Sequence, residues 1–192
     1  HTIPEGEIEL SGELIGKNAF EVVQNISTPV ERSIALAILN ALGNIDIYQP
    51  GDPLEILTGN KLCVFGYSPN VSNAKFHHII VYDFSNPQFK LSGNVEIRPF
   101  SSFSKDSCDT AVIFGSSLVN GTIDNILRNI QAKELVLTGV SSVDAPSTLK
   151  SLGFNMIGKV LAIDKHRALR TICEGGGARQ LARYTTKVFR TL

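Results

Sequence analysis

The chain has 192 residues, 43% of them hydrophobic, and its 18 basic and 18 acidic residues give a net charge of zero. This length and composition fit one α/β domain with a substantial core. No dense Lys/Arg run occurs, which argues against a nucleic-acid partner. No apolar run reaches the ~18 residues that span a bilayer, and no signal peptide opens the sequence. We therefore expect a cytoplasmic protein without a membrane partner, with a truncated or tag-derived start because His1 replaces an initiator Met.

Cysteine and histidine spacing gives little support for a metal centre. Cys63, Cys108 and Cys173 are odd in number and widely spaced, which indicates reduced thiols in a cytoplasmic protein rather than a disulfide framework. His77 and His78 are adjacent, so on a strand they would face opposite sides of the sheet. Because no Cys-x-x-Cys pair occurs either, the sequence does not predict a structural zinc site.

The segment 1–52 is expected to form a small N-terminal α+β element. Alternating residues predict a half-buried strand over 7–10, and a short helix is expected over 18–24. A second helix, over 29–42, begins with a strong start signal, because Thr28 can cap it and Glu31 completes a capping box. That helix is apolar nearly all round, which predicts burial between two layers.

After a turn-rich stretch over 48–53, interpreted as a linker or exposed loop, the pattern changes to repeated strand, turn and helix. Near-continuous Val, Ile and Leu runs are typical of parallel strands buried on both faces. The expected strands cover 61–65, 78–82, 94–97, 110–114, 134–137 and about 158–163. Helices are expected over 121–130, 146–152, 165–173 and 178–189, so the basic residues 179–190 would form a solvated helix face. The segment 53–192 is thus predicted to be a Rossmann-like, doubly wound domain with a mostly parallel sheet.

Ligands of open α/β sheets bind beyond the carboxyl ends of the strands, so the residues that follow each strand are the first site candidates. Gly66 and Tyr67 follow the first strand of the domain, and Asp83 follows the second. Dinucleotide folds often place a carboxylate for a ribose hydroxyl where Asp83 stands, although a capping or loop aspartate fits equally. The Gly-x-Gly-x-x-Gly fingerprint is absent, which weakens an NAD assignment.

The most informative stretch follows the fourth strand. Gly115, Ser116, Asn120, Gly121 and Thr122 crowd the start of a helix. One interpretation is helix capping by these residue types. The other is that backbone N–H groups and hydroxyls there hold an anion or a polar ligand, with a glycine allowing close approach of the backbone.

Two further turns carry candidates of the same kind. Gly139 and Ser141 follow the fifth strand, and Asp144 is interpreted as the cap of the helix that begins at Pro146. The run from Glu174 through Gly175 and Gly176 to Gly177 is costly in chain entropy. A tight turn explains one or two of these glycines, whereas a third suggests backbone close to a ligand or to another chain.

Taken together, these motifs resemble the heavy-metal-chelation family, a domain family of unknown function common in archaea and anaerobic bacteria. The matching segments are Glu31–Ala37 with Asn40 and Ala41, Val64–Tyr67, Gly115–Thr122, Leu137–Ser141 and Glu174–Gly177. The resemblance implies an enolase-N-terminal-like element packed on a Rossmann-like domain, with a site in the cleft between them. Two departures are a short N-terminal element and Val140 in a turn where the family favours proline.

Three functional hypotheses remain open. In the first, the strand-end residues bind a small molecule or a metal chelate, and Asp83 and Glu174 hold a divalent or heavy metal ion or act as acid and base. In the second, the same cleft binds a nucleotide-type cofactor, such as a methyl donor, and the protein is an enzyme. In the third, the protein is a non-catalytic homodimer whose glycine loop and tail bind a partner.

Overall fold

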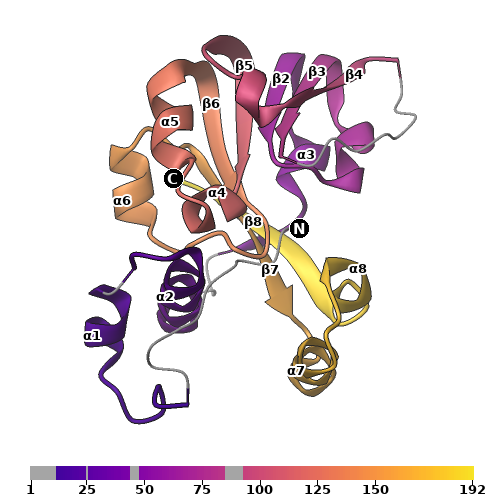
Figure 1. Ribbon diagram of the computed structural model, residues 1–192. Helices are drawn as coiled ribbons and strands as arrows, with labels where there is room; N and C mark the ends of the chain where they lie inside the picture. Colours follow the sequence, from indigo (N-terminus) through magenta and orange to yellow (C-terminus); the bar gives the residue numbers. More distant parts are fainter. Residues whose placement is uncertain (1–11, 25, 44–47, 85–92) are drawn as a thin grey trace.

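The computed structural model describes residues 12–24, 26–43, 48–84 and 93–192, which form a layered α/β fold around one sheet (Figure 1). The strands are β1 Gln49–Pro50, β2 Thr58–Phe65, β3 Lys75–Asp83, β4 Val95–Pro99, β5 Asp106–Phe114, β6 Ile130–Thr138, β7 Met156–Ala162 and β8 Thr185–Thr191. Their order in space is β1-β8-β7-β6-β5-β2-β3-β4. Strands β2 to β7 run parallel, and β8 is antiparallel to both of its neighbours. The mostly parallel, doubly wound α/β architecture is therefore confirmed.

Short helices connect and cover these strands. They are α1 Ala19–Gln24, α2 Pro29–Leu42, α3 Pro53–Ile56, α4 Ser116–Val119, α5 Ile123–Asn129, α6 Pro146–Ser151, α7 Lys165–Cys173 and α8 Ala178–Leu181, with 3-10 turns η1 Pro69–Asn73 and η2 Phe100–Ser102. In Figure 1, α1 and α2 lie on one side of the sheet's lower end, and α7 and α8 lie on the other.

The strand order reverses direction between β2 and β5. From β2 the chain winds outward through β3 to β4, then returns to the other side of β2 and winds through β5, β6 and β7. The carboxyl ends of β2 and β5 therefore lie side by side at a topological switch point. Crevices of this kind are where open α/β sheets bind ligands.

Alternate residues of each central strand enter two separate cores. On β2, Cys63 and Phe65 point into the core under α5 and α6, whereas Leu62 and Val64 point into the core under α3 and η1. All four are buried almost completely. This two-sided burial explains why the strands read as continuous apolar runs in the sequence.

Helix α2 begins as predicted but is not buried as predicted. The Thr28 hydroxyl accepts a hydrogen bond from the Glu31 backbone N–H, and the Glu31 carboxylate accepts one from the Thr28 N–H, which completes the capping box. Ala35 is the one residue of the helix that is buried, and Leu42 is 73% exposed. The expectation of burial between two layers is wrong, because among the described residues the helix is covered on one side only.

The C-terminal helix expected over 178–189 is also wrong. Only α8 is helical there, and Thr185–Thr191 forms β8, the strand that fills the space between β1 and β7. The β-branched residues Thr185, Thr186 and Val188 favour an extended backbone. Of the basic tail, Lys187 and Arg190 therefore belong to a strand, and Lys187 forms an ion pair with the buried Asp52.

The stretch over 48–53 is not a free linker. Gln49 and Pro50 form β1 and pair with β8, and Asp52 caps α3 by accepting from the Leu54 N–H at 3.1 Å. The strand expected over 7–10 lies outside the described residues, and the division of the chain at residues 52 and 53 stays a prediction.

Candidate functional site

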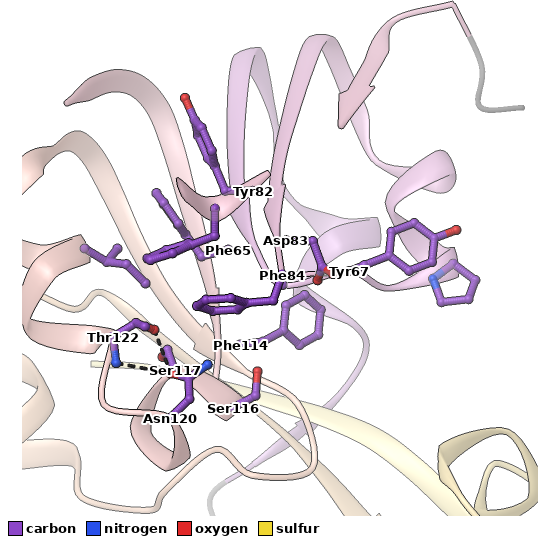
Figure 2. Close-up of a pocket in the computed structure, with 14 residues that line it drawn as sticks. Phe65, Tyr67, Tyr82, Asp83, Phe84, Phe114, Ser116, Ser117, Asn120 and Thr122 are labelled. Atoms are coloured by element: carbon purple, nitrogen blue, oxygen red, sulfur yellow. Dashed lines mark hydrogen bonds between the residues drawn. The ribbon is translucent and has the colours of Figure 1, made fainter. Parts of the chain in front are cut away.

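A pocket of about 400 Å³ lies at the switch point, at the carboxyl ends of β2, β3 and β5. It is lined by Phe65, Gly66, Tyr67, Pro69, Tyr82, Asp83, Phe84, Phe100, Phe114, Ser116, Ser117, Asn120, Thr122 and Ile126. Figure 2 shows the rings of Phe84 and Phe114 near the middle of this group, with Ser116, Asn120 and Thr122 below them. The pocket therefore combines aromatic walls with one polar edge.

Glycines on both sides hold the ring of Phe114 in place. Gly66 and Gly139 adopt the left-handed backbone region, with φ of 104° and 101°. A Cβ atom added to Gly66 would lie 3.1 Å from the Cβ of Phe114, and one added to Gly139 would lie 3.0 Å from its Cδ1. These two glycines thus serve the turns after β2 and β6 and the packing of one pocket wall.

Gly115 is required by a close approach between two backbones. A Cβ atom at this position would lie 2.2 Å from the carbonyl carbon of Ser141 and 2.4 Å from the nitrogen of Ser142. The turn after β5 therefore packs directly on the turn after β6. This contact brings the predicted residues Gly115, Gly139 and Ser141 beside the pocket, although none of the three lines it.

The polar edge is built by a tight turn between α4 and α5. The Asn120 Oδ1 accepts from the Thr122 N–H at 3.1 Å and from the Thr122 hydroxyl at 2.7 Å. Gly121 between them has φ of 75°, a conformation that glycine adopts readily. The Ser117 hydroxyl also belongs to this edge; it is buried and has no hydrogen-bond partner among the described residues. A buried hydroxyl of this kind favours a polar atom or a water beside it.

Helix α2 fixes the end of α4 through Arg32. The Arg32 Nε donates to the Val119 carbonyl at 2.6 Å, and its Nη1 donates to the Ser27 carbonyl at 3.0 Å. The N-terminal helices thus support the pocket from outside. No residue of the described segments 12–24 and 26–43 lines it, so all of its described walls come from the sheet strands and the segments that connect them.

Six predicted site residues therefore come together around one pocket: Gly66, Tyr67, Asp83, Ser116, Asn120 and Thr122. The other group, Glu174, Gly175 and Gly176, lines a separate open hollow of about 380 Å³ beside α7 and α8. Figure 1 places α7 and α8 well away from α4 and α5. The structure does not bring Asp83 and Glu174 together, because they line different pockets, so the two do not form a shared metal site.

Local geometry accounts for Gly175 and Gly176 but not for Gly177, where an added Cβ would come no closer than 3.8 Å to the Gln180 Oε1. Gly175 has φ of 81° and ends α7 with its N–H donating to the Ile172 carbonyl. A Cβ atom at Gly176 would lie 2.5 Å from the Cγ2 of Thr171. The Gly177 N–H donates to the Gln180 side chain at the start of α8. Glu174 itself forms an exposed ion pair with Arg170 at 2.8 Å.

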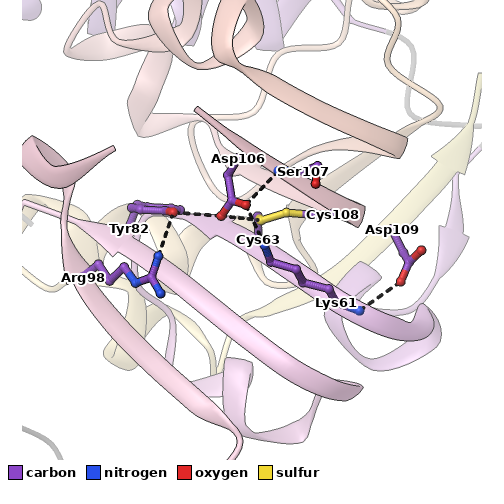
Figure 3. Close-up of a disulfide and its surroundings, with 8 residues drawn as sticks. All are labelled: Lys61, Cys63, Tyr82, Arg98, Asp106, Ser107, Cys108 and Asp109. Carbon is purple, nitrogen blue, oxygen red and sulfur yellow. Dashed lines mark hydrogen bonds and ion pairs between the residues drawn. A yellow bond between two sulfur atoms is a disulfide. The ribbon is translucent and has the colours of Figure 1, made fainter. Parts of the chain in front are cut away.

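Cys63 and Cys108 form a disulfide between β2 and β5 (Figure 3), which corrects the expectation of reduced thiols. The strands are neighbours in the sheet, and the Cα atoms of the two cysteines are 6.0 Å apart. That separation lies within the range of disulfides. The spacing of 45 residues in the sequence conceals this proximity, which arises from the pairing of parallel strands.

Asp106 lies beside this disulfide and is held as a carboxylate. Its Oδ2 is 3.6 Å from the Cys63 Sγ and accepts from the Tyr82 hydroxyl at 2.8 Å, and its Oδ1 accepts from the Lys61 Nζ at 2.6 Å. Burial opposes ionisation, but hydrogen bonds from Lys61 and Tyr82 outweigh it and lower the pKa of Asp106. Burial and the bond to Asp106 raise the pKa of Tyr82.

A second polar cluster joins α2 to the far half of the sheet. The buried Lys159 donates from its Nζ to the Asn40 Oδ1 at 2.6 Å, and the Tyr48 hydroxyl donates to the Asp144 Oδ1 at 2.6 Å. Burial lowers the pKa of Lys159, whereas burial and the bond to Asp144 raise that of Tyr48. Asp144 is not the cap of α6, as the sequence suggested, because Ala145 occupies that position.

Sequence reasoning missed the aromatic walls and the cysteine cluster. One usable signal was the position of Phe65 and Phe114, each the last residue of a buried strand and each followed by glycine. Another was the pair Asp106 and Cys108, since residues two apart on a strand share a face.

Residues 50–191 match the model of the DUF364 family, described as "putative heavy-metal chelation". The chain belongs to this family. A comparison with curated proteins finds no match.

Two solved structures share the fold, and both are DUF364 proteins with unknown function. The one from Desulfitobacterium hafniense is 21% identical with a TM-score of 0.74, over 98% of this chain and 80% of that chain. The one from Pyrococcus horikoshii is 16% identical with a TM-score of 0.70, over 97% of this chain and 80% of that chain. Within the described residues, no helix is both long and apolar enough to cross a membrane.

Proposed function

We propose that this protein binds a small organic molecule with a flat conjugated ring in the pocket at the carboxyl ends of β2, β3 and β5, and that the ligand is a metal-chelating compound. The observation that carries the proposal is the pocket's composition, with aromatic walls from Phe65, Phe84 and Phe114 and a polar edge from Ser116 and Thr122. Its volume of about 400 Å³ is typical of small-molecule sites. The family's description supports the link to metals.

The wall residues suit a planar ligand. Phe65 stacks on Tyr82 with ring centroids 5.3 Å apart, and Phe84 stacks on Phe100 at 4.7 Å. The exposed Phe84 and the partly buried Phe100 can offer faces or edges to a further ring, whereas Phe65 and Tyr82 are almost fully buried and back the wall. Contacts between aromatic rings contribute beyond their buried area. The Ser117 hydroxyl, buried and without a partner in the described chain, favours a ligand that presents a polar atom to that edge.

The charges around the pocket select among ligands. Of the described residues that line it, none is a lysine or an arginine, and Asp83 contributes a carboxyl group. Phosphate groups in proteins are usually bound by arginine, lysine or clustered backbone N–H groups. We therefore place a neutral or cationic ligand in this pocket ahead of a dinucleotide.

The lack of basic residues in the described pocket lining also favours an alternative function, that of an enzyme with a methyl-donor cofactor. An S-adenosyl compound carries a flat base, no phosphate and a positive sulfonium, so it fits the pocket's composition. Fold-level analogy alone would not distinguish these two functions. Identifying the bound compound, a metal-chelating compound or an S-adenosyl compound, decides between the two functions.

Native mass spectrometry with elemental analysis, on protein purified without oxygen, is the first experiment. A retained organic molecule, with or without a metal, supports the proposal and identifies the ligand class. It is followed by thermal-shift measurements with phenanthroline, its Ni²⁺ complex, S-adenosylmethionine and NAD.

A pocket-blocking variant, Ser116→Phe, provides the decisive comparison, and Ser151→Phe at an exposed helix position is its matched control. We expect phenanthroline or its complex to stabilise the wild type and the control but not Ser116→Phe. Stabilisation by S-adenosylmethionine alone would establish the enzyme alternative instead. Equal shifts in all three proteins would refute binding in this pocket.

A further inference from the structure

We propose that Cys63, Cys108 and Asp106 form a binding site for one soft divalent cation, such as Cd²⁺ or Zn²⁺, and that the disulfide between the two cysteines closes this site. Within the described chain, these three residues are the one group of His, Cys, Asp or Glu side chains with potential ligand atoms all within 4.8 Å of one another. Cys63, Cys108 and Asp106 do not line the aromatic pocket, although Tyr82 lines the pocket and donates to Asp106. The inference does not rest on the function proposed for that pocket.

The donor set matches a soft cation in chemistry and in geometry. Two thiolates and one carboxylate are ligands that favour soft ions such as Zn²⁺ and Cd²⁺ over Mg²⁺ or Ca²⁺. Two thiolates on a tetrahedral Zn²⁺, each at ~2.3 Å, lie about 3.8 Å apart. Neighbouring parallel strands with Cα atoms 6.0 Å apart can hold the cysteines of β2 and β5 at that separation. The fourth position would be open to a water or an exogenous ligand.

The surrounding charges balance the complex. Two thiolates and the Asp106 carboxylate carry three negative charges, and a divalent cation leaves one of them uncompensated. The Lys61 Nζ, 2.6 Å from the Asp106 Oδ1, supplies the missing positive charge and orients the carboxylate. Tyr82 donates to the other oxygen of Asp106 and is itself contacted by Arg98 at 3.5 Å. Partners of this kind outside the ligand set tune metal affinity.

The cation would reach the site from the Asp106 side. Cys63 is fully buried, Cys108 is partly buried, and the Asp106 side chain is 12% exposed beside the exposed Ser107. Figure 3 shows Asp106 between the disulfide and Tyr82, with Lys61 and Arg98 reaching the same group from neighbouring strands. A buried thiol pair with a carboxylate at its outer side is the arrangement expected of a small cation site rather than of an organic-ligand site.

Opening the site is a two-electron reduction. Two molecules of a cellular thiol give up two electrons and two protons, the Cys63–Cys108 bond breaks, and the products are two cysteine thiols and the disulfide of the reductant. Binding of the cation then releases those two protons as the two thiolates bind the metal. The protein would therefore bind the metal when thiols are abundant and release it on oxidation.

The test is an anaerobic titration with Cd²⁺ on oxidised and on thiol-reduced protein, in a Cys173→Ser background that removes the exposed free cysteine. We expect the reduced protein to bind one Cd²⁺ per chain with ultraviolet thiolate-to-metal charge-transfer absorption, and the oxidised protein to show none. No charge-transfer absorption in the reduced protein, or equal binding by both forms, overturns the proposal.

Variants separate this site from general thiol binding. Lys61→Met should lower Cd²⁺ affinity about tenfold with the absorption retained, as expected for loss of a partner outside the ligand set. Lys133→Met, which removes an exposed lysine paired with Asp109, is the matched control and should bind as the background does. Asp106→Asn should weaken binding more than Lys61→Met, and equal affinity in all of these variants contradicts the assignment. Ser116→Phe blocks the aromatic pocket and should leave Cd²⁺ binding unchanged. The ligand proposal for the pocket and the cation proposal can therefore fail independently.

Discussion

The guanidinium of Arg32 and the carbonyl of Val119 are joined by a hydrogen bond of 2.6 Å across 87 residues of sequence. Val119 is the last residue of α4, directly before the Asn120 turn that forms the polar edge of the pocket. Helix α2 therefore contributes to the site without lining it. It holds the turn after β5 in one position.

This bond leads to the first prediction. Arg32→Met should lower the free energy of unfolding by about 1.5–3 kcal/mol, because a charge-assisted hydrogen bond to a partly buried carbonyl is lost. Arg128→Met is the matched control, since Arg128 also donates from Nε to a carbonyl, but to Asp124 within its own exposed helix. Urea unfolding of the three proteins measures the difference. Equal losses in both variants would show that the long-range bond has no special role.

The contact between two turns gives the second prediction. Gly115→Ala should destabilise the fold by about 1–3 kcal/mol, because its Cβ would overlap the backbone of Ser141 and Ser142. Gly93→Ala serves as the control, as no atom of the described residues lies within 4 Å of the added atom there. Thermal unfolding should show a clear loss for Gly115→Ala and little change for Gly93→Ala. A similar melting temperature for both would mean that the turns separate easily.

Reduction of the disulfide is the basis of the third prediction. The Cys63–Cys108 bond closes a loop of sequence separation 45, for which the chain-entropy model gives about 4 kcal/mol as its contribution to stability. A thiol reductant, in the absence of metal, should therefore lower the free energy of unfolding by roughly 2–4 kcal/mol. Chemical unfolding with and without reductant measures this, and Cys63→Ser should no longer respond to the reductant. A Cys173→Ser chain should respond as the wild type does.

The buried amine of Lys159 gives a prediction about pH. Burial lowers its pKa in the folded protein, whereas in the unfolded chain it keeps its proton up to about pH 10.4. Between these two pKa values the unfolded state binds more protons, so stability should rise with pH in that window. Lys159→Met should make the pH dependence flatter in the alkaline range. Unfolding measured at a series of pH values between neutrality and about pH 10 tests this.

Lys133 provides a control of opposite sign for that experiment. The hydrogen bond with Asp109 raises the pKa of Lys133 in the folded protein. The stability that this bond contributes is fully present below the pKa of Lys133 in the unfolded chain, and it is lost as pH rises through the pKa in the folded protein. Lys133→Met should therefore leave the rise due to Lys159 intact. The explanation based on the buried Lys159 would be contradicted if the stability of the wild type did not rise with pH and Lys159→Met showed the same pH dependence as the wild type.

Much of the sheet could be predicted from the sequence because its central strands are buried on both faces. The runs around Leu62, Ile80, Val112 and Val136 are apolar at successive positions, and each becomes a parallel strand. The start of α2 was also predictable, since Thr28 and Glu31 form a cap from purely local chemistry. Six of the predicted site residues meet at one pocket because the carboxyl ends of β2, β3 and β5 share one edge of the sheet.

The features that the sequence did not reveal depend on contacts between distant segments. Residues after Ala182 mix basic, aromatic and β-branched side chains without a clear period, and pairing with β7 and β1 decides that they extend rather than coil. The disulfide depends in the same way on β2 lying beside β5. Phe84 and Phe100 enter the pocket from loop and turn positions, where no periodic pattern indicates their direction.

The place of β8 in the sheet also constrains the order of folding. Strand β8 lies between β1 and β7, and β1 pairs with no other strand among the described residues. During synthesis, β1 is made early and must wait until residues 185–191 have left the ribosome before it can join the sheet. Until then β7 presents an open edge, so this half of the molecule would be the most exposed to unwanted strand pairing in a nascent chain. Completion of the last strand then protects both segments in a single step.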